Sequence, residues 1–182
     1  ASEAVGPLTY YPLCLYHCPQ CYLVQLGYVL PTEKTFGEQY TYLTGSSRSL
    51  VDYYTLLARD LVDKHGLNPG DVIIEIGSND GTFLNAFRDL GLQVLGVEGA
   101  TNASSIAEAQ GIPTITRFFG KGIVPLIKSR LPADGRVRLI LAMNVLAHTD
   151  NINEFLPEVV ALMDPDTTFI SSSHWLLDLI RN

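Results

Sequence analysis

The sequence predicts an α/β protein with a doubly wound, Rossmann-like sheet, preceded by a small β-rich module. From Ser46 onward, apolar segments with strand character alternate with segments of helical periodicity. The strand candidates 72–76 and 138–143 are apolar on both faces, as the strands of a parallel sheet covered by helices require. The 182 residues suffice for one α/β domain and a small appendage.

The alternation gives each element in order. A first helix begins at Ser46 or Ser47 as N-cap and ends at His65-Gly66, because apolar residues recur at helical spacing between them. Five strands follow, each succeeded by a helix. The predicted strands cover 71–76, 92–98, 112–119, 136–144 and 166–173. The predicted helices cover 81–91, 102–111, 122–131, 152–163 and 174–182.

Composition divides the chain into residues 1–45 and residues 46–182. The first region is rich in Tyr, Pro and Cys, with short apolar stretches that indicate strands and turns. The chain has three closely spaced cysteines, Cys14, Cys18 and Cys21. An odd number at this spacing does not indicate a disulfide framework and fits a reducing compartment. Metal ligation and simple burial of the thiols both remain open.

Charge and hydropathy exclude several classes of partner. The net charge is -7 and the 12 basic residues are scattered, so we expect neither nucleic acid nor an acidic membrane surface as a partner. No apolar run approaches the roughly 20 residues of a membrane span. No signal peptide is visible, although the chain opens on Ala1 and is interpreted as a trimmed fragment. We therefore expect a cytoplasmic protein of undetermined oligomeric state.

The turn after the first predicted strand carries the chemistry. It reads Glu75-Ile76-Gly77-Ser78-Asn79-Asp80-Gly81, at the edge of a doubly wound sheet where ligands bind. A dinucleotide site would read G-x-G-x-x-G and place a pyrophosphate on the helix N-terminus. Here Asp80 stands inside the loop, and a carboxylate there repels a pyrophosphate and attracts a cation. A glycine-rich turn that serves packing alone is the competing interpretation.

S-adenosylmethionine (SAM) fits this combination, because it has a sulfonium and an ammonium group and no phosphate. Glu75 or Asp80 can attract the ammonium, and Gly77 lets the backbone approach the methionyl part. Glu98 ends the second strand, 98 − 75 = 23 residues after Glu75. An acid about 20 residues on, at the tip of the second strand, binds the ribose hydroxyls in such folds.

The motifs "CPQCYLVQL", "YTYLTGSS", "VIIEIGSNDGTFL", "VLGVEGA", "GIPTITRFF" and "NVLAHTDNINEFL" occur in an order that resembles the SAM-dependent C-methyltransferases acting on nucleotide-linked deoxysugars. The resemblance implies a class I methyltransferase core with an incomplete sheet and a zinc-ribbon-like N-terminal module. It implies SAM contacts by the glycine loop (Glu75, Gly77, Ser78, Asn79, Asp80 and Gly81) and by Glu98, Phe119 and Asn144. The family's usual proline after the acid is Gly99 here.

The resemblance also implies the reaction. A base removes a proton next to the ketone of a nucleotide-linked 4-keto-deoxysugar, and the enolate carbon attacks the SAM methyl group. The family's base lies in a His-Glu-His stretch beyond Asn182, so we expect this chain to bind SAM without turnover. His148 is assigned as an auxiliary acid/base or substrate contact, and Tyr42 as a hydrogen-bond donor. The alternatives are a histidine bonded to nearby backbone and a tyrosine that only packs.

Zinc is the second implied group. The family module has two C-x-x-C knuckles, of which this chain has one, Cys18 and Cys21. Two thiolates do not complete a tetrahedral site, so zinc and vacant thiols both stay open. For the function, a non-catalytic SAM-binding or interaction domain is the alternative to the enzyme. An NAD-linked oxidoreductase is a third possibility, which Asp80 disfavours.

Overall fold

The computed structural model describes residues 10–37 and 40–181. Contacts divide the chain into two compact units, Ala1–Pro31 and Thr32–Asn182. The described part of the first unit holds an antiparallel hairpin of β1 (Leu15–His17) and β2 (Val24–Leu26). Residues 32–45, which composition grouped with the N-terminal region, belong by their contacts to the second unit.

The second unit is built on one sheet of five parallel strands. They are β3 (Asp71–Ile76), β4 (Gln93–Glu98), β5 (Thr114–Thr116), β6 (Arg136–Met143) and β7 (Thr168–Ser172). Their order in the sheet is β5-β4-β3-β6-β7, with every pairing parallel. The first strand of this unit, β3, is therefore the central one, and the chain moves outward from it in both directions, which is the Rossmann-like topology.

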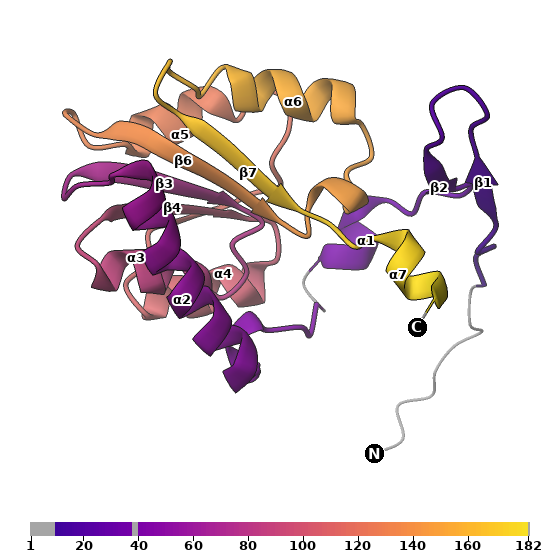
Figure 1. Ribbon diagram of the computed structural model, residues 1–182, viewed down its shortest axis with the longest axis horizontal. Coiled ribbons are helices and arrows are strands. Elements are labelled where there is room, and N and C mark those ends of the chain that lie inside the picture. Colours follow the sequence, from indigo (N-terminus) through magenta and orange to yellow (C-terminus); the bar gives the residue numbers. More distant parts are fainter. Residues whose placement is uncertain (1–9, 38–39, 182) are drawn as a thin grey trace. The chain divides into compact units, whose positions relative to one another are not determined.

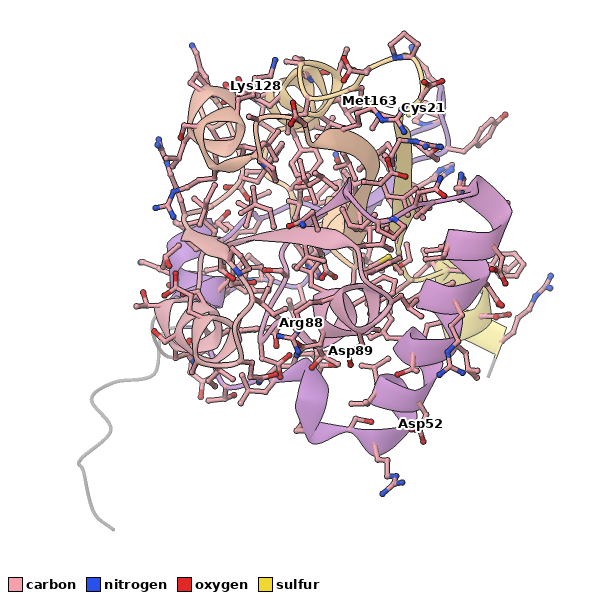
Figure 2. The ribbon with its side chains drawn as sticks, turned by 90° about the vertical axis from the view of Figure 1, so that its left-hand side faces the viewer. Cys21, Asp52, Arg88, Asp89, Lys128 and Met163 are labelled. Carbon is pink, nitrogen blue, oxygen red and sulfur yellow. The ribbon has the colours of Figure 1, made fainter. Side chains whose placement is uncertain are left out.

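Helices cover both faces of this sheet (Figure 1). The α-helices of the unit are α1 (Thr32–Phe36), α2 (Arg48–His65), α3 (Thr82–Asp89), α4 (Thr101–Ala109), α5 (Val124–Arg130), α6 (Ile152–Val160) and α7 (Leu176–Arg181). Two short 3₁₀ helices, η1 (Thr44–Ser46) and η2 (Leu146–His148), flank the carboxyl edge of the sheet. Figure 2 places Arg88 of α3 and Lys128 of α5 on opposite sides of the sheet.

Each helical layer encloses its own apolar core. On one side, Tyr54, Phe83 and Phe87 from α2 and α3 pack with Ile73 of β3. On the other side, side chains of α5 and α6 pack against Ile74 and its neighbours. Successive residues of β3 thus serve opposite cores, which explains why this strand is apolar on both faces.

The observed elements agree with the predicted ones to within about three residues at most ends. Gly66 terminates α2 with a left-handed backbone (φ 56°) and an N–H bonded back to the helix, and Ser47 is the N-cap residue of α2, although its side chain makes no capping bond. The largest difference is the strand predicted over 112–119, of which only β5 forms. Its neighbour β4 offers pairing partners to Thr114, Ile115 and Thr116, and the Arg117 N–H turns back to the Ile115 carbonyl.

None of the helices within residues 10–37 and 40–181 is long and apolar enough to cross a membrane. The carboxyl ends of β3, β4 and β6 meet at one edge of the sheet, where the chain changes direction between its two halves. Open α/β sheets bind ligands at this topological switch point.

Candidate functional site

The glycine turn lies directly beyond β3. Gly77 (φ 68°), Asn79 (φ 51°) and Gly81 (φ 77°) all adopt left-handed backbone, which costs little only for glycine and, to a lesser degree, asparagine. A Cβ at Gly77 would lie 2.6 Å from Val145 Cγ2. The Gly77 N–H donates to the Val97 carbonyl at 2.8 Å, so the turn is fixed to β4. The residue pattern thus positions a rigid loop over the end of the sheet.

Glu98 ends β4 beside this loop and is buried. Its Oε2 accepts the Asn79 N–H at 2.8 Å, and its Oε1 accepts the Ala100 N–H at 2.7 Å. Burial raises the pKa of the Glu98 carboxyl, and the backbone N–H bonds from Ala100, Asn79 and Gly99 oppose that rise. A carboxylate has about four acceptor sites, so Glu98 can accept further hydrogen bonds beyond those from the backbone.

Glu75 lies one residue before the end of β3 and is also buried. Its Oε2 has no hydrogen-bond partner among the described residues. Burial, with the charges of Glu98 and Asp80 added, raises the pKa of Glu75 well above its ordinary value. The Glu75 side chain does not line the cavity described below.

Asp80 binds protein groups with both carboxylate oxygens. Oδ2 accepts the Gly45 N–H at 2.8 Å, and Oδ1 accepts the Thr82 hydroxyl at 2.6 Å and the Thr82 N–H at 3.2 Å. Asp80 does not line the cavity. Its carboxylate therefore connects the glycine loop, the start of α3 and the segment around Gly45, and a direct contact to a cofactor stays a prediction.

Asn79 makes a similar connection. Its Oδ1 accepts the Thr44 N–H at 2.9 Å, and its Nδ2 donates to the Tyr42 carbonyl at 3.0 Å. We call residues 40–45 the strap, because their backbone runs across the glycine loop and is bonded to the side chains of Asn79 and Asp80. The Tyr40 carbonyl accepts a further bond from Asn102 Nδ2 of α4.

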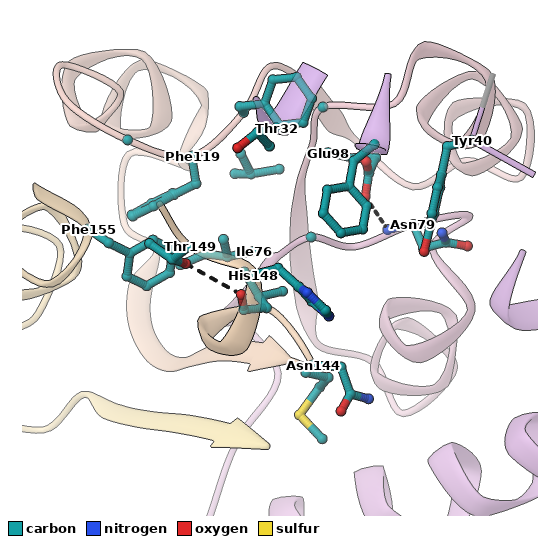
Figure 3. A pocket seen from close by; sticks show the side chains of 18 of the residues that line it. Thr32, Tyr40, Ile76, Asn79, Glu98, Phe119, Asn144, His148, Thr149 and Phe155 are labelled. Carbon is teal, nitrogen blue, oxygen red and sulfur yellow. Dashed lines mark hydrogen bonds between the residues drawn. The ribbon is translucent and has the colours of Figure 1, made fainter. Parts of the chain in front are cut away.

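Loop, strap and sheet edge enclose a cavity of about 370 Å³ (Figure 3). Its walls are aromatic and polar, and three carboxylates, those of Glu98, Asp150 and Glu154, reach it. Among the described residues, no lysine or arginine lines it. In Figure 3, Glu98, Asn79 and Tyr40 lie along one wall, and Phe119 and Phe155 lie on the other side.

One end of the cavity is aromatic. Phe119 packs on Phe155 with ring centroids 4.8 Å apart, and Phe118 lies against Gly99, directly after Glu98. Phe119 was expected from the sequence. The sequence did not predict Phe118 and Gly99 as cavity residues. Each is next in sequence to a predicted site residue, Phe119 and Glu98 respectively, and this adjacency could have indicated them.

His148 and Tyr42, the two predicted catalytic residues, both line the cavity. His148 belongs to η2, beyond the end of β6, and its ring lies 5.3 Å from that of Phe36. Burial, with the charge of His174 added, lowers the pKa of the His148 imidazole, which favours its neutral form. Tyr42 is half-exposed.

The remaining predicted residues differ in their access to the cavity. Asn144, with left-handed backbone (φ 57°), lines it, and its N–H donates to the Ser172 carbonyl at 2.9 Å. Ser78 and Gly81 do not line it. The Ser78 hydroxyl is buried without a partner among the described residues, and a Cβ at Gly81 would lie 3.1 Å from Ala107. Both residues shape the loop from behind.

Sequence reasoning missed the wall formed by α1. Thr32 and Phe36 of this short helix line the cavity, and the Thr32 hydroxyl donates to Asp150 Oδ2 at 3.1 Å. Tyr40 lines the cavity as well and is more enclosed than Tyr42. Its pKa is raised by burial and by the nearby charge of Glu98. No periodic pattern marks these residues, because they precede the first long helix.

The cysteines of the first unit are all free, with Cys14 and Cys21 exposed. Over the part of the chain that the structure describes, no group of three or more His, Cys, Asp or Glu side chains is placed to hold a metal ion. The zinc-ribbon-like site that the resemblance implied is therefore not seen in these residues.

Comparisons with known proteins agree with the fold. The methyltransferase domain family matches residues 50–179. The C-methyltransferase NovU of Streptomyces niveus is 33% identical over 181 residues, which are 100% of this chain and 42% of the relative. The chain thus spans less than half the length of this curated relative.

Two solved structures resemble part of this chain. A SAM-dependent methyltransferase from Clostridium acetobutylicum is 14% identical, with a TM-score of 0.49, and the match covers 66% of this chain and 49% of that chain. A putative methyltransferase from an antibiotic biosynthesis pathway of Anabaena variabilis is 17% identical, with a TM-score of 0.49, covering 69% and 51%. Because the family model matches residues 50–179, which are more than half of the chain, this chain belongs to the methyltransferase domain family.

Proposed function

We propose that this chain is the cofactor-binding half of a C-methyltransferase that methylates a carbon next to the ketone of a nucleotide-linked 4-keto-deoxysugar. The family match and the 33% identity to a C-methyltransferase support this proposal. Because the chain spans 42% of that relative, we assign turnover to the whole protein and cofactor binding to this chain.

The observation that carries the cofactor assignment is how the Glu98 carboxylate is hydrogen-bonded at the cavity. Backbone N–H groups hold both of its carboxylate oxygens, and Glu98 lines the cavity. A carboxylate fixed in this way can accept one hydroxyl on each oxygen, which matches the vicinal 2′- and 3′-hydroxyls of a ribose. The rigid loop at Gly77 stands beside it, where a methionyl group attached to that ribose would extend.

The charge of the cavity favours a cationic donor. Three carboxylates reach it, and no lysine or arginine among the described residues does. A pyrophosphate would meet like charge here, whereas the ammonium and sulfonium groups of SAM would meet opposite charge. In this assignment Gly77, Asn79 and Asn144 contact the cofactor, Phe119 lies on its base side, and Ser78 and Gly81 shape the loop. Asp80 contributes negative potential from behind it, and Glu75, whose raised pKa favours the uncharged form, packs behind the loop.

The chemistry follows from the acidity of the substrate. A sugar C–H next to a ketone loses its proton to a base, and the charge passes to the carbonyl oxygen as an enolate. The enolate carbon then attacks the methyl group, the methyl–sulfur bond breaks, and its electron pair converts the sulfonium into a neutral thioether. We assign His148, as a neutral imidazole, to a substrate contact or auxiliary acid/base role, and Tyr42 to donating a hydrogen bond to the enolate oxygen.

The N-terminal cysteines suit half of a zinc site. Backbone N–H groups of Cys21 and Gln20, with the Cys21 thiol, lower the pKa of the Cys18 thiol, which favours the thiolate that zinc requires. Cys18 and Cys21 supply two ligands, whereas a structural zinc site needs four. We assign these two residues as two of the four zinc ligands, on the condition that other residues supply the remaining two.

Calorimetric titration tests the cofactor assignment. We expect S-adenosylhomocysteine (SAH) and SAM to bind with one site per chain and NADH not to bind. In the Glu98→Gln variant an amide N–H₂ must face a backbone N–H, so we expect affinity to fall roughly 10- to 100-fold, the worth of hydrogen bonds to a charged group. The exposed Glu108→Gln variant is the matched control. Saturable NADH binding without SAH binding would contradict the assignment.

The substrate class needs the whole protein and a separate measurement. With a nucleotide-linked 4-keto-deoxysugar in D₂O and SAH in place of SAM, we expect deuterium to enter at the carbon next to the ketone, because the enolate forms without methyl transfer. Binding of SAH together with no deuterium exchange would leave a SAM-binding domain of non-catalytic or different function.

A further inference from the structure

We propose that Phe36 of α1 is a positioning residue, which supports the imidazole of His148 at the wall of the cavity. The hydrogen bond from Thr32 to Asp150 holds α1 in place for this role. The inference rests on the proposed function, because His148 is the residue assigned to contact the substrate. It gives the short helix that precedes the strap a part in the site.

The first step is that α1 touches one short segment of the chain at two places. Thr32 and Phe36 lie four positions apart, about one helical turn, and therefore share a face of the helix. The Thr32 hydroxyl donates to Asp150 Oδ2 at 3.1 Å. The Phe36 ring centroid lies 5.3 Å from that of His148, with the two ring planes at 59°. A helix of five residues is not stable by itself, so contacts to this distant segment fix where α1 lies.

The second step concerns the His148 ring. The backbone N–H of His148 donates to the Val145 carbonyl at 2.9 Å, which fixes the main chain. Within residues 10–37 and 40–181, the imidazole has no hydrogen-bond partner, and Phe36 is the aromatic ring that packs on it. Figure 3 shows the imidazole pointing into the cavity. Its orientation there depends on packing, and Phe36 supplies that packing.

The third step is that Phe36 is not a core residue. It is half-buried, lines the cavity and belongs to neither apolar core. Its ring also meets that of Tyr40 in the strap edge-on, with ring centroids 5.3 Å apart. Such tilted and edge-on arrangements are the preferred geometries of aromatic pairs. Because both of these partners line the cavity, the packing of Phe36 serves the site.

The surroundings of His148 give the expected effect of losing Phe36. The ionisable side chains that share the cavity wall with His148 are those of Tyr40, Tyr42, Tyr54, Glu98, Asp150 and Glu154. Burial, with the charge of His174 added, lowers the pKa of the imidazole. Replacing Phe36 changes none of these charges and admits water to the ring, so we expect the pKa of His148 to rise toward its ordinary value of 6.5.

NMR titration of the His148 ring in the full chain, without ligand, tests the proposal. In the unaltered chain we expect nuclear Overhauser contacts between the rings of Phe36 and His148. In Phe36→Ala we expect the pKa of His148 to rise, whereas Phe36→Tyr, which keeps the ring, should keep the wild-type value. Tyr53→Ala removes an exposed ring of α2 outside the cavity lining and should leave this titration unchanged.

A second variant tests the part played by Thr32. Thr32→Val removes the hydroxyl that bonds to Asp150, keeps the shape of the side chain and changes no charge. We expect it to move the pKa of His148 in the same direction as Phe36→Ala. It should have little further effect in the Phe36→Ala background, because both changes act through α1.

The whole protein gives the functional readout, which is the rate of deuterium entry into the keto-sugar with SAH bound. Because His148 acts as a neutral imidazole in the proposed function, we expect the acidic limb of the pH–rate profile to move to higher pH in Phe36→Ala. A fall in the rate by the same factor at every pH would indicate a purely structural role for Phe36 and would contradict the proposal.

Absence of the ring contacts in the unaltered chain, or the same pKa of His148 in Phe36→Ala as in wild type, would overturn the proposal. The ring contacts are measured without any substitution, so this outcome does not depend on the folding of a variant. The titration needs neither cofactor nor substrate. A chain that bound no SAH would therefore show failure of the proposed function, which is distinguishable from a failure that concerns Phe36.

Discussion

Glu75 is a buried carboxyl group, and one of its oxygens lacks a hydrogen-bond partner in the described part of the chain. Burial and the nearby carboxylates of Glu98 and Asp80 oppose its ionisation. Strongly perturbed carboxyl groups cluster at functional sites. The raised pKa of Glu75 favours its protonated, uncharged form, so Glu75 marks the candidate site without adding negative potential to it.

The raised pKa of Glu75 makes stability depend on pH. Above the ordinary pKa of 4.5, the unfolded chain gives up this proton while the folded chain keeps it. The folded state then binds more protons, so the free energy of unfolding decreases as pH rises through the window from 4.5 up to the raised pKa. We expect Glu75→Gln to remove most of this decrease, with Glu98 contributing the remainder.

Urea unfolding between pH 4.5 and 8 measures this effect. The exposed Glu108→Gln variant should keep the wild-type slope of stability against pH. If the Glu75→Gln variant had the same slope of stability against pH as wild type, the pKa of Glu75 would not be raised in the folded protein, and the prediction would be contradicted.

At the scale of elements, the strap joins segments that are far apart in sequence. Residues 42–45 are bonded to Asn79 and Asp80, which lie 35 to 37 positions later in the chain. Tyr40, Tyr42 and Thr44 of the strap line the cavity. Asn79 and Asp80 thus act on the cavity through the strap as well as through the loop.

Gly45 offers a way to disturb the strap without changing any charge. A Cβ there would lie 2.9 Å from the Thr82 hydroxyl and 3.0 Å from Asp80 Oδ2, so Gly45→Ala forces the strap away from the loop. We expect the dissociation rate of SAH to rise roughly tenfold, the effect of a loss of about 1.4 kcal/mol, because the strap lines the cavity that we assign to this ligand. Stopped-flow displacement measures this rate.

The control for this variant is Gly91→Ala. Gly91 has left-handed backbone (φ 87°) and open space around it, away from the cavity lining, so its substitution destabilises the fold without touching the site. An SAH dissociation rate in Gly45→Ala that is no higher than in Gly91→Ala would contradict a role of the strap in holding the ligand.

The elements show where sequence reasoning succeeds and where it does not. The central strands were predictable because burial on both faces leaves a continuous apolar run, as in β3 and β6. The position of Glu98 at the end of β4 was predictable, because the pattern of the strand fixes where the strand ends. The partners of Asp80 were not, because whether a carboxylate faces a ligand or the Gly45 N–H depends on how a distant segment crosses the loop. The strap was not predictable either, because its residues follow neither the helical nor the strand periodicity of apolar side chains.

At the scale of the whole molecule, the cavity belongs to one unit. All its described lining residues lie between Thr32 and Phe155, within the second unit. We therefore expect Cys18→Ser/Cys21→Ser and an excess of chelator to leave the SAH affinity within twofold of wild type. Calorimetry on the full chain measures this. A loss of affinity in either case would show that the cysteine unit contributes to the cofactor site.

The division into units also shows a limit of composition as a guide. Composition placed a boundary after residue 45, where the Tyr-rich region ends, whereas contacts place it after Pro31. The difference is physical, since residues 40–45 carry aromatic side chains that serve the cavity and backbone groups that bond to the glycine loop. A segment of module-like composition can thus be part of the cofactor domain.

The central claim is that acids around a tight turn at the sheet edge hold an adenosyl donor. Titration of the ¹⁵N-labelled chain with SAH, followed by amide chemical shifts, tests it most directly. We predict saturable shifts concentrated at the Gly77–Gly81 turn, at Glu98–Ala100 and at Phe118–Gly120. Saturable shifts confined to other parts of the chain, or no shifts at millimolar SAH, would contradict the claim.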